Sequence, residues 1–211
     1  MELADDAYSI LAAAADTAGN TMTIIAFNVM SNPKIYENLR KELFQTYPDA
    51  DAKLEFQKLE KLPYLTAVIK EGLRLAFGVA GRLPRLVPEP GATFNGYFVP
   101  AGMIVSMSAW TQHHDEDLFP NSDKFDPNRW LNRADAMRLD KNLFAFGKGN
   151  RGCIGMPLAY CELYLVIGTF FHRFKDLKPY LTTKEDLILD DFFSTYHVAG
   201  KNWLKATGPA E

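Results

Sequence analysis

Cys153, one of the two cysteines of the chain, stands in a glycine-rich stretch directly before an amphipathic helix. Residues 146–155 read Phe-Gly-Lys-Gly-Asn-Arg-Gly-Cys-Ile-Gly, and apolar positions at helical spacing follow from Met156 to Phe174. A thiolate beside a helix N-terminus is stabilised by the helix dipole and by free N–H groups. Glycines allow positive φ angles and a close backbone approach to a flat group. The stretch therefore predicts a thiolate ligand whose donor strength backbone N–H groups can tune.

Two other interpretations of this stretch have to be weighed. Gly147, Gly149 and Gly152 form a G-x-G-x-x-G pattern, which is typical of dinucleotide-binding turns. That interpretation is disfavoured because no apolar strand precedes the pattern and no second strand with an acidic end follows the helix. A flexible glycine loop around an inert, buried cysteine is the commoner meaning of a lone cysteine, so the decision depends on the spacing of the residues around it.

The spacing argues against an inert cysteine. The stretch fits F-x-x-G-x-R-x-C-x-G at every specified position, namely Phe146, Gly149, Arg151, Cys153 and Gly155. It resembles the haem-binding signature of the cytochrome P-450 superfamily. The resemblance implies that Cys153 is the axial ligand of the iron in haem b, with Gly149 and Gly155 in the cofactor-binding loop. It also implies that Phe146 packs against this loop and that Arg151 reaches a haem propionate.

A second motif pairs Glu71 with Arg74, which lie three residues apart and share a face of a predicted helix. Such pairs are common, but Glu-Gly-Leu-Arg resembles the family's E-x-x-R. Residues 125–130, Phe-Asp-Pro-Asn-Arg-Trp, resemble its F-x-P-E-R-F/W segment, with Asn128 in the usual Glu position. The resemblance implies a buried ionic triad of Glu71, Arg74 and Arg129 that supports the thiolate loop and takes no part in the chemistry. Loss of one member would strand a buried charge, at about 3–5 kcal/mol.

A third motif lies in the first predicted helix. Residues 13–18, Ala-Ala-Ala-Asp-Thr-Ala, resemble the family's A-G-x-D/E-T-T, with Ala14 in place of Gly and Ala18 in place of the second Thr. The resemblance implies that Asp16 and Thr17 are catalytic and relay protons to oxygen. A mid-helix Thr can also donate to a preceding carbonyl and bend the helix. The alternative is an Ala-rich packing face that carries a solvated Asp.

Smaller expectations follow from the same resemblance. Arg85 matches the position of an arginine that binds a propionate, and a bidentate guanidinium suits a carboxylate; an ordinary surface arginine is the alternative. Residues 79–83 and 193–198 would touch the substrate. The adjacent His113 and His114 point in different directions and have no third ligand at suitable spacing, so we do not expect a metal site there. Cys161 lies inside the last helix and is expected to be a packing residue.

Charge is distributed unevenly, although the chain of 211 residues carries a net charge of only −3. This near-neutral balance predicts neither nucleic acid nor an anionic membrane as a partner. Between Asn132 and Gly152, five basic residues outnumber two acidic ones, and we expect this face to steer an acidic flavoprotein reductase, with an ordinary mixed surface as the alternative. The residues are Arg133, Arg138, Lys141, Lys148 and Arg151 against Asp135 and Asp140.

The predicted fold is mainly α with small β-sheets (α+β), which is the C-terminal half of a cytochrome P-450 fold. Two cysteines exclude a disulfide framework, and we expect neither a signal peptide nor an apolar run as long as a membrane span. The expected elements are helices over 7–29, 33–43, 63–77 and 156–174, a hairpin around Asn95-Gly96, a buried strand over 103–107, a mostly irregular stretch over 113–146 and a last strand pair within 187–203.

The resemblance covers residues 1–211 as a partial domain, because family members are about twice this length; the N-terminal half, with its membrane anchor and lid helices, is absent. It implies a haem-dependent monooxygenase that inserts one atom of O2 into a small apolar organic substrate. NADPH supplies electrons through NADPH-cytochrome P-450 reductase. The sequence around the motifs most resembles fungal microsomal members of the family, many of which serve secondary metabolism. A full-length relative would lie at the endoplasmic reticulum membrane, whereas this chain without an anchor would be cytoplasmic.

Two alternative functions stay open at this point. The chain could be a non-catalytic remnant with impaired haem binding, because half of the pocket wall is missing. It could also be a haem-thiolate isomerase or peroxygenase that does not use O2. The retained Asp16-Thr17 pair argues against the latter, since that pair serves proton delivery to oxygen.

Overall fold

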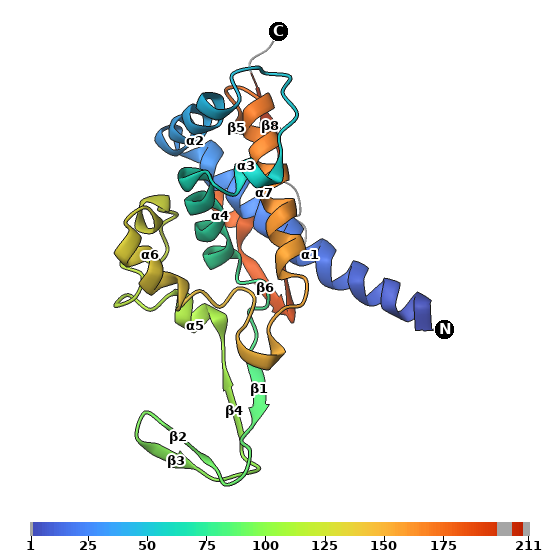
Figure 1. Ribbon diagram of the computed structural model, residues 1–211, viewed down its shortest axis with the longest axis vertical. Helices are drawn as coiled ribbons and strands as arrows, with labels where there is room; N and C mark the ends of the chain where they lie inside the picture. Colours follow the sequence, from blue (N-terminus) through green and yellow to red (C-terminus); the bar gives the residue numbers. More distant parts are fainter. Residues whose placement is uncertain (1, 198–203, 209–211) are drawn as a thin grey trace.

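A computed structural model describes residues 2–197 and 204–208 of the protein. These residues form a mainly helical body with small two-stranded sheets, which confirms the predicted α+β class (Figure 1). The helices are α1 (Glu2–Ser31), α2 (Pro33–Thr46), α3 (Phe56–Leu59), α4 (Pro63–Ala76), α5 (Ala109–His113), α6 (Arg133–Asp140) and α7 (Met156–Arg173), with the 3-10 turns η1 (Pro127–Trp130), η2 (Gly149–Arg151) and η3 (Lys184–Leu187).

The sheets are antiparallel pairs. The hairpin predicted around Asn95-Gly96 is confirmed, and both turn residues have positive φ, 46° and 84°, as a tight two-residue turn requires. The predicted last strand pair is confirmed up to His197, and its remainder, 198–203, lies outside the described residues. The pairs are β1 (Leu83–Leu86) with β4 (Ile104–Met107), β2 (Ala92–Phe94) with β3 (Tyr97–Val99), β5 (Lys178–Pro179) with β8 (Ala206–Thr207), and β6 (Leu189–Phe192) with β7 (Ser194–His197).

The core is built by one half of α1 together with α2, α4 and α7. Ile25 and Val29 of α1 are fully buried, as are Leu43 of α2, Leu65 of α4 and Phe171 of α7. Burial of these apolar side chains is the main driving force that brings the four helices together. The helix periodicities in the sequence predicted all four.

The other half of α1 projects from the body toward the N-terminus (Figure 1). Its apolar side chains lie in the open, with Leu3 85% and Ile10 66% exposed. The segment Leu3–Ser31 is long and apolar enough to cross a membrane, so the expectation that no segment reaches that length is wrong. A core helix passes the same test, and residues 24–30 of α1 do lie in the core.

Two caps fix the helices that carry the site. Asn32 follows α1 and caps α2 by accepting from the N–H groups of Lys34 and Ile35 at 3.2 and 3.3 Å. The carboxylate of Glu42 on α2 accepts from the N–H groups of Tyr64 and Leu65, both at 2.8 Å, and so caps α4 from a neighbouring helix. Burial raises the pKa of Glu42.

One local prediction is wrong. Residues 103–107 were expected to form a buried strand, but in β4 Ile104 is 69% and Met107 52% exposed, because β4 pairs with β1 alone in the described part of the chain. The stretch 113–146 is mostly irregular, as expected, and holds the short helical segments η1 and α6. α6 begins at an Asn132 cap but buries little besides Leu139, so it has no apolar periodicity to reveal it.

Candidate functional site

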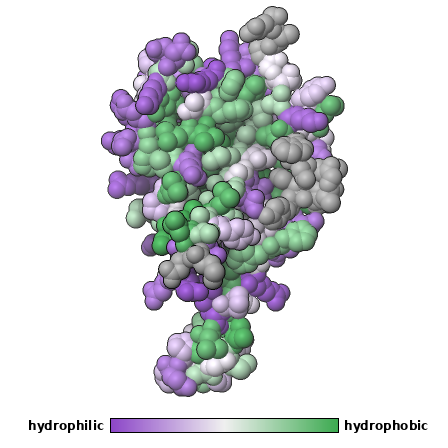
Figure 2. Space-filling view, turned by 90° about the vertical axis from the view of Figure 1, so that its right-hand side faces the viewer, coloured by the Kyte–Doolittle hydropathy of each residue, from purple (hydrophilic) through white to green (hydrophobic). Residues whose placement is uncertain are grey.

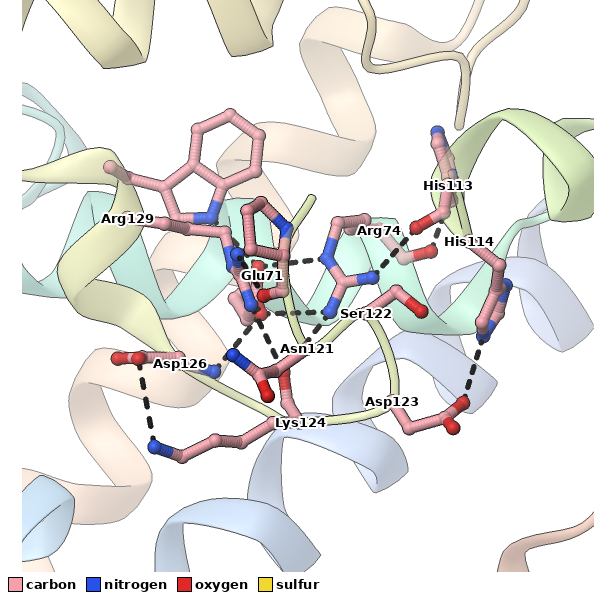
Figure 3. Close-up of polar contacts among 12 residues, drawn as sticks. Glu71, Arg74, His113, His114, Asn121, Ser122, Asp123, Lys124, Asp126 and Arg129 are labelled. Atoms are coloured by element: carbon pink, nitrogen blue, oxygen red, sulfur yellow. Dashed lines mark hydrogen bonds and ion pairs between the residues drawn. The ribbon is translucent and has the colours of Figure 1, made fainter. Parts of the chain in front are cut away.

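Glu71 and Arg74 lie side by side on α4, and the side chains of both are completely buried. The Arg74 guanidinium donates from Nε to Glu71 Oε2 at 3.0 Å and from Nη2 to Oε1 at 2.9 Å. This is a bidentate pair, the strongest arrangement for two such groups. Figure 3 shows Glu71 in the middle of the cluster, with Arg74 on one side and Arg129 on the other.

Glu71 accepts three further hydrogen bonds from the segment at η1. The donors are Arg129 Nε at 3.0 Å, Trp130 Nε1 at 2.9 Å and the backbone N–H of Asp126 at 3.0 Å. A buried carboxylate needs several donors to offset the loss of water, and Glu71 has them. The sequence motifs pointed to Arg129, whereas Trp130 and the Asp126 N–H were not predicted as partners of Glu71.

The loop around Cys153 is closed by backbone hydrogen bonds. The Cys153 N–H donates to Phe146 O at 2.8 Å, and the Gly152 N–H donates to Gly149 O at 3.0 Å. Gly147 and Gly149 have φ angles of 64° and 73°, which side-chain-bearing residues rarely adopt. The Phe146 ring lies 5.3 Å from the Tyr160 ring of α7, which attaches the loop to that helix.

The surface beside Cys153 is apolar and open. Cys153 is exposed, and its neighbours Ile154, Met156 and Leu158 are 100%, 42% and 55% exposed. Figure 2, viewed from the side toward which α1 projects, shows green apolar side chains interspersed with hydrophilic ones on the body, and green side chains again on the small lobe of β2 and β3. Exposed apolar surface on this scale is typical of a region that another group covers.

Asp16 and Thr17 lie half-buried at the middle of α1. The Thr17 hydroxyl donates to Ala13 O at 2.8 Å, which is the back-bonding expected of a mid-helix Thr. One turn further on, the buried Asn20 amide donates to the backbone O and to Oγ1 of Thr195 at 2.7 and 2.8 Å. The helix that carries the Asp-Thr pair is thereby attached to strand β7.

The two segments predicted to touch the substrate meet. An isolated antiparallel bridge joins Val79 to Ser194, at the turn between β6 and β7. Phe192 and Phe193 at this turn are 69% and 68% exposed. Val198, the end of the second segment, lies outside the described residues. The structure therefore places an apolar turn next to the start of β1.

The remaining predicted residues, apart from Cys161, lie at the surface. Arg85 on β1 is exposed and donates from Nη1 to Pro84 O at 2.9 Å, and Arg151 in η2 is also exposed. On the basic face, Lys148 donates to the backbone O of Asp140 at 3.1 Å, and the Asp140 carboxylate forms an ion pair with Lys70 at 2.7 Å. Cys161 is half-buried on α7.

The architecture places the chain in a class of known fold. The crystal structure of a cytochrome P450 (CYP102L1) superposes with a TM-score of 0.78 over 94% of this chain and 43% of that chain, at 23% identity. The family profile named Cytochrome P450 matches residues 1–194. The chain belongs to the cytochrome P450 family.

Two fungal relatives resemble the chain over most of its length. Cytochrome P450 monooxygenase MO6277 of Ascocoryne sarcoides is 42% identical over 90% of this chain and 38% of the relative. Cytochrome P450 monooxygenase macH of Penicillium terrestre is 40% identical over 90% of this chain and 37% of the relative. The chain thus spans less than two fifths of the length of these relatives.

The residues around Cys153 fit the haem that membership of this family implies. The donor is a soft thiol at the N-terminus of α7, of the kind that ligates haem iron. A Cβ added at Gly155 would lie 3.8 Å from Cys153 Sγ, so the glycine keeps the space beside the sulfur open. The exposed Ile154, Met156 and Leu158 form an apolar rim that a flat macrocycle would cover.

Proposed function

We propose that this chain is the haem-binding part of a monooxygenase that inserts one atom of O2 into an apolar organic substrate. The observation that carries the proposal is the exposed Cys153 thiol on a closed glycine loop with an apolar rim. When bound, haem supplies the iron at which dioxygen is activated. Cys153 donates electron density to that iron, and Arg85 and Arg151 pair with the propionates.

Asp16 and Thr17 carry the proton-handling part of the proposal. A carboxylic acid next to a hydroxyl offers a relay for the protons that O–O cleavage consumes. The Thr17 hydroxyl donates its one hydrogen to Ala13 O in this structure. In the relay role this hydrogen turns away from Ala13 O and is passed on, and Oγ1 accepts another proton in its place. The hydrogen bond from Asn20 to Thr195 attaches α1 to β7, and so it fixes the position of Asp16 and Thr17 relative to that strand.

The finer parts of the proposal concern partners and place. Electrons come from NADPH through NADPH-cytochrome P-450 reductase, which docks on the basic face of Arg133, Arg138, Lys141, Lys148 and Arg151. By resemblance to fungal microsomal members of the family, the substrate comes from secondary metabolism, and a full-length relative lies at the cytosolic face of the endoplasmic reticulum. These assignments rest on analogy with the relatives.

A second candidate is a non-catalytic remnant that binds haem poorly. The observation that favours it is the exposure of Cys153 and of the apolar side chains beside it. Haem titration separates the two candidates. The monooxygenase proposal requires saturable uptake of one haem per chain, followed by the long-wavelength Soret band of the reduced carbon monoxide complex from which the family takes its name. Absence of haem uptake would support the remnant.

The relay is tested on the haem-loaded chain supplied with the reductase and NADPH. Thr17→Val should raise the share of consumed O2 that is released as hydrogen peroxide by about tenfold or more, because proton delivery fails. Thr23→Val is the matched control, since Thr23 donates to Gly19 O in the same helix at 2.9 Å. Equal peroxide release from both variants would contradict the assignment of Thr17.

A further inference from the structure

His113 lies at the end of α5 and is completely buried. It makes two hydrogen bonds with Arg74, which belongs to the Glu71 cluster, the buried group of Glu71, Arg74, Arg129 and Trp130. Its ring atom Nδ1 lies 2.8 Å from Arg74 O, and its own backbone O accepts from Arg74 Nη1 at 2.9 Å. Figure 3 shows His113 beside Arg74, on the side of the cluster away from Arg129.

The other ring nitrogen reaches the segment that leads into the Cys153 loop. The Phe144 N–H donates to His113 Nε2 at 2.8 Å. A backbone carbonyl can only accept and a backbone N–H can only donate. Nδ1 must therefore carry the proton and Nε2 must not, so a neutral imidazole of one tautomer is needed to make both bonds.

The bonds continue from Phe144 to the cysteine. Phe144 O accepts from the Gly147 N–H at 2.9 Å, and Phe146 O accepts from the Cys153 N–H at 2.8 Å. One uninterrupted path of hydrogen bonds and short backbone segments thus runs from Glu71 through Arg74 and His113 to the amide of Cys153.

The surroundings keep this histidine neutral. The rings of Phe77 and Phe119 lie 6.2 and 6.1 Å from its ring, and they come from the end of α4 and from the loop before η1. Burial, together with the charges of Arg74 on α4 and of His114 on its own helix, lowers the pKa of His113 to about 4, against the opposing effect of its hydrogen bond to Arg74 O.

We propose that His113 is the positioning residue that couples the buried Glu71 cluster to the Cys153 loop. Its imidazole fixes Phe144 relative to α4, and so sets where the thiolate stands at the N-terminus of α7. The proposal rests on the proposed function only in giving Cys153 the ligand role; the mechanical coupling itself is a property of the haem-free chain.

The test is amide hydrogen exchange on the haem-free 211-residue chain. His113→Asn keeps a donor close to the position of Nδ1 and removes the acceptor at Nε2, so the bond to Arg74 O can persist while the bond to Phe144 is lost. Exchange over residues 144–153 should become about tenfold faster or more, while exchange over α4 stays unchanged. The matched control is His114→Asn, because the His114 ring bonds within its own helix to Trp110 O at 3.0 Å; it should leave both segments unchanged.

Two outcomes would overturn the proposal. Unchanged exchange over 144–153 would show no coupling, and equal acceleration over α4 and the loop would show a role in general stability alone. If His113→Asn does not fold, the long-range proton–nitrogen spectrum of the parent imidazole decides: protonated Nδ1 and bare Nε2 support the proposal, and the opposite tautomer refutes it. Haem uptake by the parent is measured separately. Absence of haem binding would count against the proposed function, whereas the exchange result alone decides the role of His113.

Discussion

The cluster around Glu71 and the loop around Cys153 differ in how far each is completed by its own chain. Glu71 and Arg74 are 0% exposed, and the carboxylate accepts five hydrogen bonds from three side chains and one backbone N–H. Cys153 has a closed backbone around it, but its side chain and the adjoining Ile154 face outward.

The difference indicates that the cluster around Glu71 has a structural role and that the loop around Cys153 has a role in binding the cofactor. A buried ionic cluster is stable only when all its polar groups are paired, so its partners have to be built into the chain. A cofactor ligand has to stay accessible until the cofactor occupies its place, so its apolar surroundings are left open. Perturbing the first region should therefore affect folding, and perturbing the second should affect haem binding.

The largest effect on stability is expected from Glu71→Gln. The variant leaves the Arg74 and Arg129 guanidinium groups without their buried counter-charge, and the free energy of unfolding should fall by about 3–5 kcal/mol. Urea denaturation measures this change. The matched control is Glu55→Gln, because Glu55 pairs with Lys58 at the same i,i+3 spacing but on the surface, at 3.2 Å with both side chains more than half exposed. The control should change stability by less than about 1 kcal/mol, and similar losses in both variants would remove the distinction between the regions.

The next effect depends on pH. The pKa of His113 lies at about 4 in the folded chain and near 6.5 in the unfolded chain. Between these values the unfolded chain binds the extra proton, so stability falls as the pH is lowered from 6.5 to 4, by on the order of 3 kcal/mol, and the contribution is complete above 6.5. Denaturant titrations at several pH values measure the free energy of unfolding. Its fall between pH 6.5 and 4 should be larger in the parent than in His113→Phe, by the amount that His113 contributes. A slope that the substitution leaves unchanged would contradict the neutral, buried imidazole.

Arg129→Lys should have a smaller effect than Glu71→Gln. The Arg129 side chain is 11% exposed and donates to Glu71 Oε1 from Nε and to Pro120 O from Nη1. A lysine keeps the charge but cannot make both bonds, so we expect a loss of about 1 kcal/mol in the free energy of unfolding. A loss as large as that of Glu71→Gln would show that the fork of Arg129, and not the charge of Glu71, dominates the cluster.

Much of this arrangement could be predicted from the sequence. The four long helices have apolar periodicity, the hairpin has Asn95-Gly96, and the spacing of Glu71, Arg74, Arg129 and Cys153 matches known motifs. The contribution of His113 could not be predicted, because both of its ring partners are backbone atoms, 39 and 31 residues away. The exposure of β4 was also missed, since an apolar strand does not reveal whether anything covers its face.

The central claim, that Cys153 is the haem ligand and stands apart from the fold's support, is tested most directly by Cys153→Ala. Because the thiol is exposed, the free energy of unfolding of the haem-free chain should change by less than about 0.5 kcal/mol. In the same variant, the long-wavelength Soret band of the reduced carbon monoxide complex should disappear, whereas Cys161→Ala should retain it. Persistence of the band in Cys153→Ala, or its loss in Cys161→Ala, would contradict the assignment.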